Sequence, residues 1–183
     1  ALRFQLSVRN FFRPKIGWFL ADIGNIVFGL FVRGYNSLLR LKALNPKKIS
    51  IEESLGLPMD WEKFWNEASK DWDFIFNKNS ESMIWRYVKN PDNYNFISLR
   101  SNDSLVGFVV YKLVSDESGT NLVIADFLCL KNDIGALNYC IRHIKSKGLK
   151  MDARSIMLWC DSSSPYFDIF KKNGFFDVAS IPV

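Results

Sequence analysis

The sequence predicts an α+β (α/β three-layer) domain, in which a mixed central sheet lies between helices and an amphipathic helix precedes the domain. Three observations lead to this prediction. Hydrophobic residues make up 48% of the chain and charged residues 23%, as in a folded globular domain. From about residue 60, helical periodicity gives way to strand alternation and then returns. Asn, Asp and Gly clusters separate the periodic segments, as turns do. A length of 183 residues accommodates one core with an appendage.

The cysteines and the histidine limit the chemistry. Cys129, Cys140 and Cys160 are far apart and odd in number, which suits neither a disulfide framework nor a zinc site. We therefore expect a reducing, cytoplasmic compartment. The single histidine, His143, cannot build a histidine metal site, so we expect no bound metal. Catalysis by a cysteine–histidine pair is also disfavoured, because we expect the thiols to be buried.

Residues 1–50 form a basic arm, and residues 51–183 form the domain. Residues 1–48 hold nine Lys or Arg and a single acid, Asp22, which gives this segment a local net charge of +8. From residue 16 to 42, apolar side chains recur at helical spacing and predict an amphipathic helix that needs a partner surface. These side chains are Ile16, Phe19, Leu20, Ile23, Val27, Leu30, Phe31 and Leu38.

Three partners could cover the apolar stripe of this arm. A transmembrane span is disfavoured, because the apolar run from Ile16 to Val32 is short and contains Asp22 and Asn25. The helix could instead lie on an anionic membrane surface, with its cations near the head groups. We favour docking on its own domain or on a neighbouring one, since an apolar stripe ordinarily faces a core. Nucleic acid is not an expected partner, because no recognition motif accompanies the charge.

Two helices open the domain. Between residues 60 and 71, four apolar side chains share one helical face, and Asp60 stands at the N-cap position. The four are Trp61, Phe64, Trp65 and Ala68. A second helix is predicted to begin at Ser80 or Ser82 and to end at Asn90, because Pro91 disfavours helical backbone before it.

Three strands follow, over residues 94–99, 105–114 and 122–130. Turn-forming residues join them at positions 101–104 and 116–119, which predicts an antiparallel meander.

The last third of the chain returns to helical spacing. A helix over residues 134–147 is predicted to end at Gly148, since glycine is a common C-terminal cap. The apolar run at residues 155–160 predicts a buried strand, parallel to the preceding strand across this crossover helix. A helix over residues 165–172 that Gly174 ends, and a strand over residues 175–183, complete the domain.

Two stretches resemble the GNAT acyltransferase superfamily. IWRYVKNPDNYNFISL, at residues 84–99, is similar to a signature of bacterial GNAT-like proteins in which Trp-Arg-Tyr precedes a proline, a tyrosine and a strand. SPYFDIFKKNGFFDV, at residues 164–178, is similar to a late motif in which a helix ends in Gly-Phe before a strand. The resemblance covers residues 51–183 and implies a GNAT-like sheet with acetyl-CoA or another acyl-CoA as cosubstrate. We expect Trp85 and Tyr87 to pack inward, although they could line a cleft.

The resemblance also implies a cofactor loop, Q/R-x-x-G-x-G/A, whose N–H groups hold the pyrophosphate at a helix N-terminus. Here the loop is incomplete, because Ile134 replaces its first glycine. Asp133 is expected to cap the helix and to repel a pyrophosphate. N–H groups at the end of the preceding strand would polarise the thioester. The cofactor-binding residues implied in this way are Leu128, Cys129, Leu130, Lys131, Asn132, Gly135 and Ala136.

Asp126 and Tyr166 are the catalytic candidates. The superfamily commonly carries a tyrosine four residues before the late glycine, where this chain has Phe170. Tyr166, one turn earlier, could protonate the leaving thiolate or could simply pack. Asp126 could accept the proton of the attacking group if burial raises its pKa, or could be a paired structural carboxylate.

Two functions stay open. One is direct transfer of an acyl (acetyl) group from acyl-CoA to an amine or a similar small-molecule acceptor. The other is a non-catalytic GNAT-like module that completes a partner domain or binds a ligand, which the incomplete loop favours. Some members contain two GNAT-like halves, and a chain that starts at Ala1 resembles the C-terminal half of such a tandem. Residues 16–42 would then dock on the N-terminal half or on a dimer partner.

Overall fold

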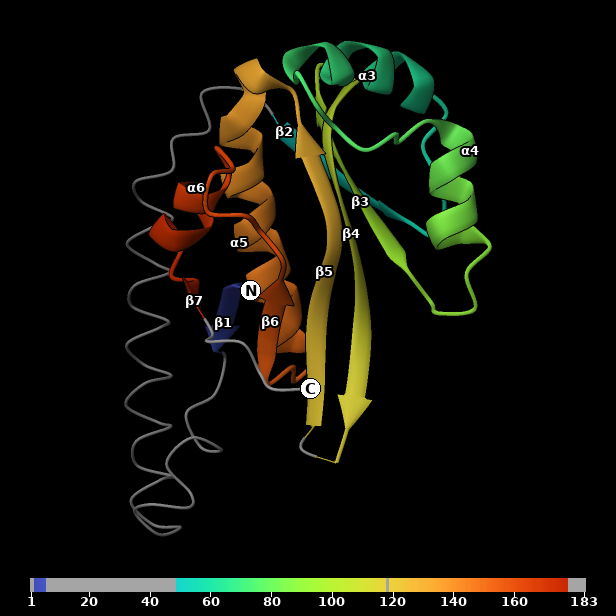
Figure 1. Ribbon diagram of the computed structural model, residues 1–183. Coiled ribbons are helices and arrows are strands. Elements are labelled where there is room, and N and C mark those ends of the chain that lie inside the picture. Colours follow the sequence, from blue (N-terminus) through green and yellow to red (C-terminus); the bar gives the residue numbers. More distant parts are fainter. Residues whose placement is uncertain (1, 6–48, 118, 178–183) are drawn as a thin grey trace, which may run out of the picture.

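The computed structural model describes residues 2–5, 49–117 and 119–177 (Figure 1). A mixed sheet of seven strands lies at the centre, in the spatial order β2, β3, β4, β5, β6, β1 and β7. Helices α3 and α4 cover one face, and α5 and α6 cover the other. Their bounds are Trp61–Ala68, Ser80–Met83, Ile134–Lys150 and Phe167–Lys172. This three-layer arrangement confirms the predicted fold class. Among the described residues, no helix is both long enough and apolar enough to cross a membrane.

The predicted meander is confirmed by strands β3 (Asn95–Ser101), β4 (Ser104–Asp116) and β5 (Gly119–Cys129), which pair antiparallel in that order. Asn102 and Asp103 turn between β3 and β4 with positive φ of 47° and 64°. This conformation belongs to tight hairpins, and Asn and Asp tolerate it better than most residues.

Strand β6 (Ser155–Leu158) lies parallel to β5, and α5 makes the crossover between them, as predicted. The predicted helix end at Gly148 is wrong, because α5 continues to Lys150. The left-handed residue after the helix is Asp152, with φ of 52°. The N–H of Ala153 donates to the carbonyl of Gly148 at 2.9 Å, which makes this end a Schellman motif.

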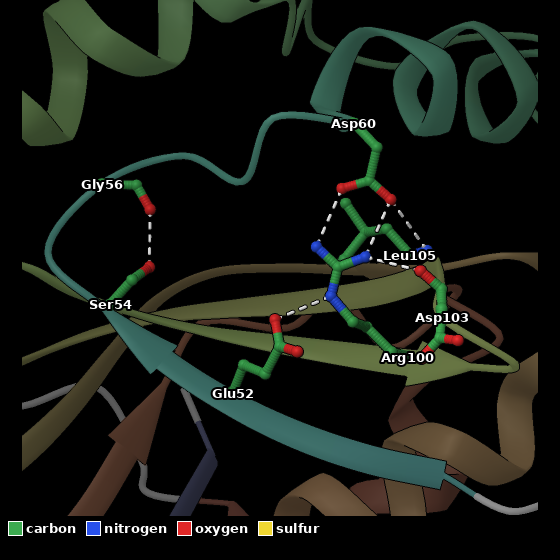
Figure 2. Close-up of polar contacts among 7 residues, drawn as sticks. All are labelled: Glu52, Ser54, Gly56, Asp60, Arg100, Asp103 and Leu105. Carbon is green, nitrogen blue, oxygen red and sulfur yellow. Dashed lines mark hydrogen bonds and ion pairs between the residues drawn. The ribbon is translucent and has the colours of Figure 1, made fainter.

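The first predicted helix is confirmed as α3 with a short 3₁₀ turn, η1 (Ser69–Asp71). Trp61 is buried and meets Phe108 of β4 edge to face, at 4.6 Å between ring centroids. Asp60 precedes the helix, but its carboxylate does not act as the predicted cap. It pairs instead with Arg100 through two bonds of 2.9 Å (Figure 2). Arg100 also donates to Glu52 of β2 at 2.7 Å and so ties α3 to the sheet edge.

Two strands were not predicted. Edge strand β2 (Ile49–Ser54) pairs antiparallel with β3. Strand β1 (Leu2–Gln5) comes from the start of the basic arm and lies between β6 and β7 (Phe176–Asp177), antiparallel to both. The amphipathic helix expected over residues 16–42, and its docking, lie outside the described residues, as does the end of the predicted last strand.

Candidate functional site

The parallel strands β5 and β6 separate at a β-bulge. The pairing of β4 with β5 shifts between Val110 and Tyr111, which leaves Ala125 as an extra residue. Within the described sheet, β6 pairs with β5 only as far as the Leu158↔Ile124 pair. The remainder of β5, up to Cys129, therefore borders an opening between the two strands, which we call the split. Open α/β sheets commonly bind ligands at the carboxyl ends of their strands.

Backbone N–H groups of β5 point alternately toward β4 and toward the split. Leu130 donates to the carbonyl of Val106 on β4 at 2.9 Å. The N–H groups of Phe127 and Cys129 therefore face the split. Each of them already has a partner within the chain. Phe127 donates to the carboxylate of Asp126 at 2.8 Å, and Cys129 donates to the hydroxyl of Tyr166 at 3.3 Å.

Tyr166 fills the split from the side of α6. Its hydroxyl donates to the carbonyl of Cys129 at 3.0 Å, so the phenol engages both polar groups of that residue. Its ring lies 5.4 Å from that of Phe127 and 5.6 Å from that of Trp72. Burial raises the pKa of Tyr166, so the phenol keeps its proton near neutral pH. Of the two roles considered for Tyr166, this geometry matches packing directly. A role as proton donor would require the hydroxyl to leave Cys129.

Asp126 lies at the bulge, where it joins a partly buried polar cluster with side chains that flank α4. The ammonium of Lys78 lies 2.6 Å from both carboxylate oxygens, and the hydroxyl of Tyr87 donates to one of them at 3.2 Å. Burial, followed by the charge of Asp126, raises the pKa of Tyr87. The carboxylate is therefore paired, and a base role for it would require Lys78 to move.

Trp72 contributes a hydrogen-bond donor that is not yet paired within the described part of the chain. Its indole Nε1 is buried and has no hydrogen-bond partner among the described residues. Buried donors are ordinarily satisfied, so such an exception calls for an explanation. Because the indole stacks obliquely on Tyr166, this N–H is a spare donor beside the split.

Comparisons with known proteins assign the fold. No family model and no curated protein matches the sequence. Solved structures do match. An aminoglycoside acetyltransferase from an uncultured soil metagenomic sample has a TM-score of 0.54 and 15% identity over 77% of this chain and 95% of its own. A GNAT family acetyltransferase of Staphylococcus aureus has a TM-score of 0.52 and 15% identity, over 73% and 97%.

The chain has the GNAT fold. A further neighbour, an aminoglycoside N-acetyltransferase solved with CoA, has a TM-score of 0.51 and 12% identity over 77% of this chain and 96% of its own. At these identities the likeness is one of fold.

The segment that follows β5 in this GNAT fold is the one expected to hold a pyrophosphate. The N–H of Lys131, two residues after the end of β5, donates to the carboxylate of Asp71 at 2.9 Å, so an acidic side chain of this chain takes that donor. Asp133 occupies the N-cap position of α5, although no side-chain capping bond from it forms within the described residues. Gly135 is exposed, and its Cβ would meet no described atom within 4 Å beyond its chain neighbours and the backbone of its own helix, whereas Ala136 is buried. Nothing is described of the side chain of Asn132.

The Trp-Arg-Tyr motif of the GNAT resemblance forms a π-helix, η2 (Ile84–Val88), directly after α4. Tyr87 packs inward against Tyr94 and Phe96, as expected. The inward packing expected of Trp85 is wrong, because 72% of this side chain is exposed. Trp85 and Arg86 instead line a surface cavity of about 700 Å³.

Three residues near the split could not be predicted from the sequence. Lys78, Trp72 and Asp71 lie in or beside the connection between η1 and α4, which carries no periodic pattern. A lysine in such a connection is ordinarily solvated, and no local signal indicates that it pairs with a carboxylate 48 positions later. Among the described residues, no group of three His, Cys, Asp or Glu side chains could hold a metal ion.

Proposed function

We propose that this chain is an acyltransferase domain that moves an acyl group from acyl-CoA to an amine or a similar small acceptor. The observation that carries the proposal is the split that follows the β-bulge. It brings a carboxylate, Asp126, and two backbone N–H groups, those of Phe127 and Cys129, to the carboxyl end of one strand. The fold supports the proposal, since solved neighbours include acetyltransferases of aminoglycosides, one of them with CoA.

In the proposed reaction, the substrates replace the internal partners of the site. The thioester carbonyl takes the N–H of Cys129 from Tyr166, and this N–H then stabilises the negative charge that develops on the carbonyl oxygen. The acceptor amine takes the place of Lys78 at Asp126, which accepts its proton. The released Tyr166 hydroxyl is available to protonate the departing thiolate. Trp72 Nε1–H supplies one further donor near the split.

The test separates binding from transfer. We expect millimolar acetyl-CoA to raise the melting temperature, because a ligand of the native state stabilises it. Release of free CoA thiol would then be measured across a panel of small amines. Asp126→Asn should keep the binding and lose about 10²-fold or more of the transfer rate, since general base catalysis contributes that much. Equal rates for the variant and the wild type would remove Asp126 from the mechanism.

A second function has an observation of its own in its favour. The described N–H groups of Phe127, Cys129 and Lys131 all bond to side chains of this chain. A protein with these bonds permanently in place would be a non-catalytic GNAT-like module that completes a partner domain or binds another ligand. If neither acetyl-CoA nor CoA changes the melting temperature, this second function replaces the first.

The cysteines bear on the reducing compartment that the sequence predicts. All three cysteines are free in the structure, and burial raises the pKa of the Cys129 thiol to about 12, so it stays protonated. A cytoplasmic location, a tandem partner and the docking of residues 16–42 stay predictions.

A further inference from the structure

Lys78 holds a primary amine in the middle of the candidate site. Lys78 is only 8% exposed, although it lies in a connection between helices. The backbone there is anchored, because the buried indole of Trp61 donates to the carbonyl of Lys78 at 2.7 Å. The ammonium lies 2.6 Å from both oxygens of Asp126.

An amine bound to Asp126 is the arrangement that the proposed function requires of an acceptor. Lys78 Nζ occupies the place where an attacking amine would give up its proton. The N–H groups that face the split, at Phe127 and Cys129, are one and three residues further along the same strand. Phe127 N–H donates to the same carboxylate at 2.8 Å, so the ammonium of Lys78 and the first of these N–H groups meet at one side chain.

From this juxtaposition, and resting on the proposed function, we infer that Lys78 is itself an acyl acceptor and that the domain acylates its own lysine. Asp126 takes a proton from Nζ, and the neutral amine attacks the thioester carbonyl. The new bond joins Nζ to the carbonyl carbon, and the bond from carbon to sulfur breaks. The departing CoA thiolate takes up the second proton that Nζ loses on becoming an amide nitrogen, and Asp126 releases its own proton to solvent.

The product differs from the starting state in charge. An acylated Lys78 is a neutral amide and cannot form an ion pair with Asp126. The carboxylate is then free to receive a second amine, so acylation of Lys78 converts the internally paired site into one open to an external acceptor.

The test uses the whole chain, acetyl-CoA and mass spectrometry of intact protein and of peptides. We expect one acetyl group, on Lys78, at least ten times more abundant there than on the exposed Lys63 and Lys70. Asp126→Asn should lose this preference, and Lys78→Arg should remove the modification while keeping the charge. Labelling that favours Lys63 and Lys70, or that is unaffected in Asp126→Asn, would indicate unassisted chemistry and overturn the inference.

The melting temperature of the same samples reports whether acetyl-CoA binds. This measurement separates failure of the inference from failure of the proposed function. If acetyl-CoA binds and is transferred to small amines while Lys78 stays unmodified, the inference alone is wrong. If acetyl-CoA does not bind, the proposed function fails and this inference fails with it. The labelling of the wild-type chain can contradict the inference by itself. The test therefore still holds if a substituted protein folds poorly.

Discussion

Trp72 keeps a buried indole N–H without a partner among the described residues, and leaving a buried donor unsatisfied costs about 1–3 kcal/mol. Phenylalanine retains most of the ring and removes the N–H. We expect Trp72→Phe to leave the melting temperature unchanged or to raise it slightly. If the N–H serves acyl-CoA, the same change should weaken acetyl-CoA binding about 5-fold, as the loss of a bond of about 1 kcal/mol does. Titration calorimetry would measure the affinity.

The matched control for this experiment is Trp85→Phe, because Trp85 is exposed and belongs to a different surface. Its affinity for acetyl-CoA should equal that of the wild type. Unchanged binding by Trp72→Phe would show that the spare donor serves no ligand.

Lys145 is buried on α5, and its ammonium donates to the carbonyl of Asn173 at 3.1 Å. Burial lowers the pKa of this lysine to about 8, from an ordinary value of 10.5. Between these two pH values the unfolded chain binds more protons than the folded one, so stability from this group rises with pH. We expect Lys145→Met to be the more stable protein at pH 7, and its advantage to shrink as the pH approaches 10.5. Urea unfolding of both proteins at several pH values would measure this, and a constant difference would contradict it.

At the scale of whole elements, two helices end in the same way with different residues. Both α5 and α6 close in Schellman motifs, with Asp152 and Gly174 in the left-handed position at φ of 52° and 84°. Glycine adopts this conformation without a steric penalty, whereas a residue with a side chain pays one. We expect Asp152→Gly to raise the free energy of unfolding by about 0.5–1 kcal/mol, and Gly174→Ala to lower it by about 1 kcal/mol. Denaturant unfolding would measure both, and destabilisation by Asp152→Gly would contradict the first.

Elements with a complete local pattern could be predicted from the sequence. Helix α3, the meander and the crossover from β5 to β6 follow from periodicity and turn residues, and the late helix follows from Gly174. The end of α5 could not be predicted, because Gly148 lies four positions before Asp152, where the chain turns, and Asp is not specific for this role. The π-helix could not either, since its bond from Lys89 N–H to the carbonyl of Ile84 has no sequence signature.

The sequence predicted two residues of the site, but not the side chains with which they pair. Asp126 and Tyr166 both border the split, and the sequence already allowed a paired carboxylate and a packed tyrosine. Their partners could not be predicted, because Lys78 and Trp72 reach the site through tertiary packing rather than through local spacing. Whether the two residues catalyse anything stays a prediction.

At the scale of the molecule, β1 joins the first described residues to the last. Leu2 is fully buried, and its strand pairs with β6 on one side and β7 on the other. We expect Leu2→Ala to lower the free energy of unfolding by about 2–5 kcal/mol, the usual cost of removing a buried leucine side chain. Leu113→Ala, on an exposed part of β4, should cost far less. Guanidinium unfolding would measure both, and equal small effects would mean that β1 is not part of the cooperative sheet.

The position of β1 also sets the order in which the sheet can be completed. Leu2 pairs with Leu158 and Asp177, more than 150 residues later in the chain. During synthesis, β1 leaves the ribosome while neither of its neighbours has been made, and the chain must grow past Asp177 before both are present. Contacts over such separations close slowly, because the intervening chain has to be ordered first. Strand β1 can therefore join the sheet only after β6 has been made, and β7 can join only through β1, its neighbour in the sheet. Until then the newly made protein exposes the edge of β6 to whatever surrounds it.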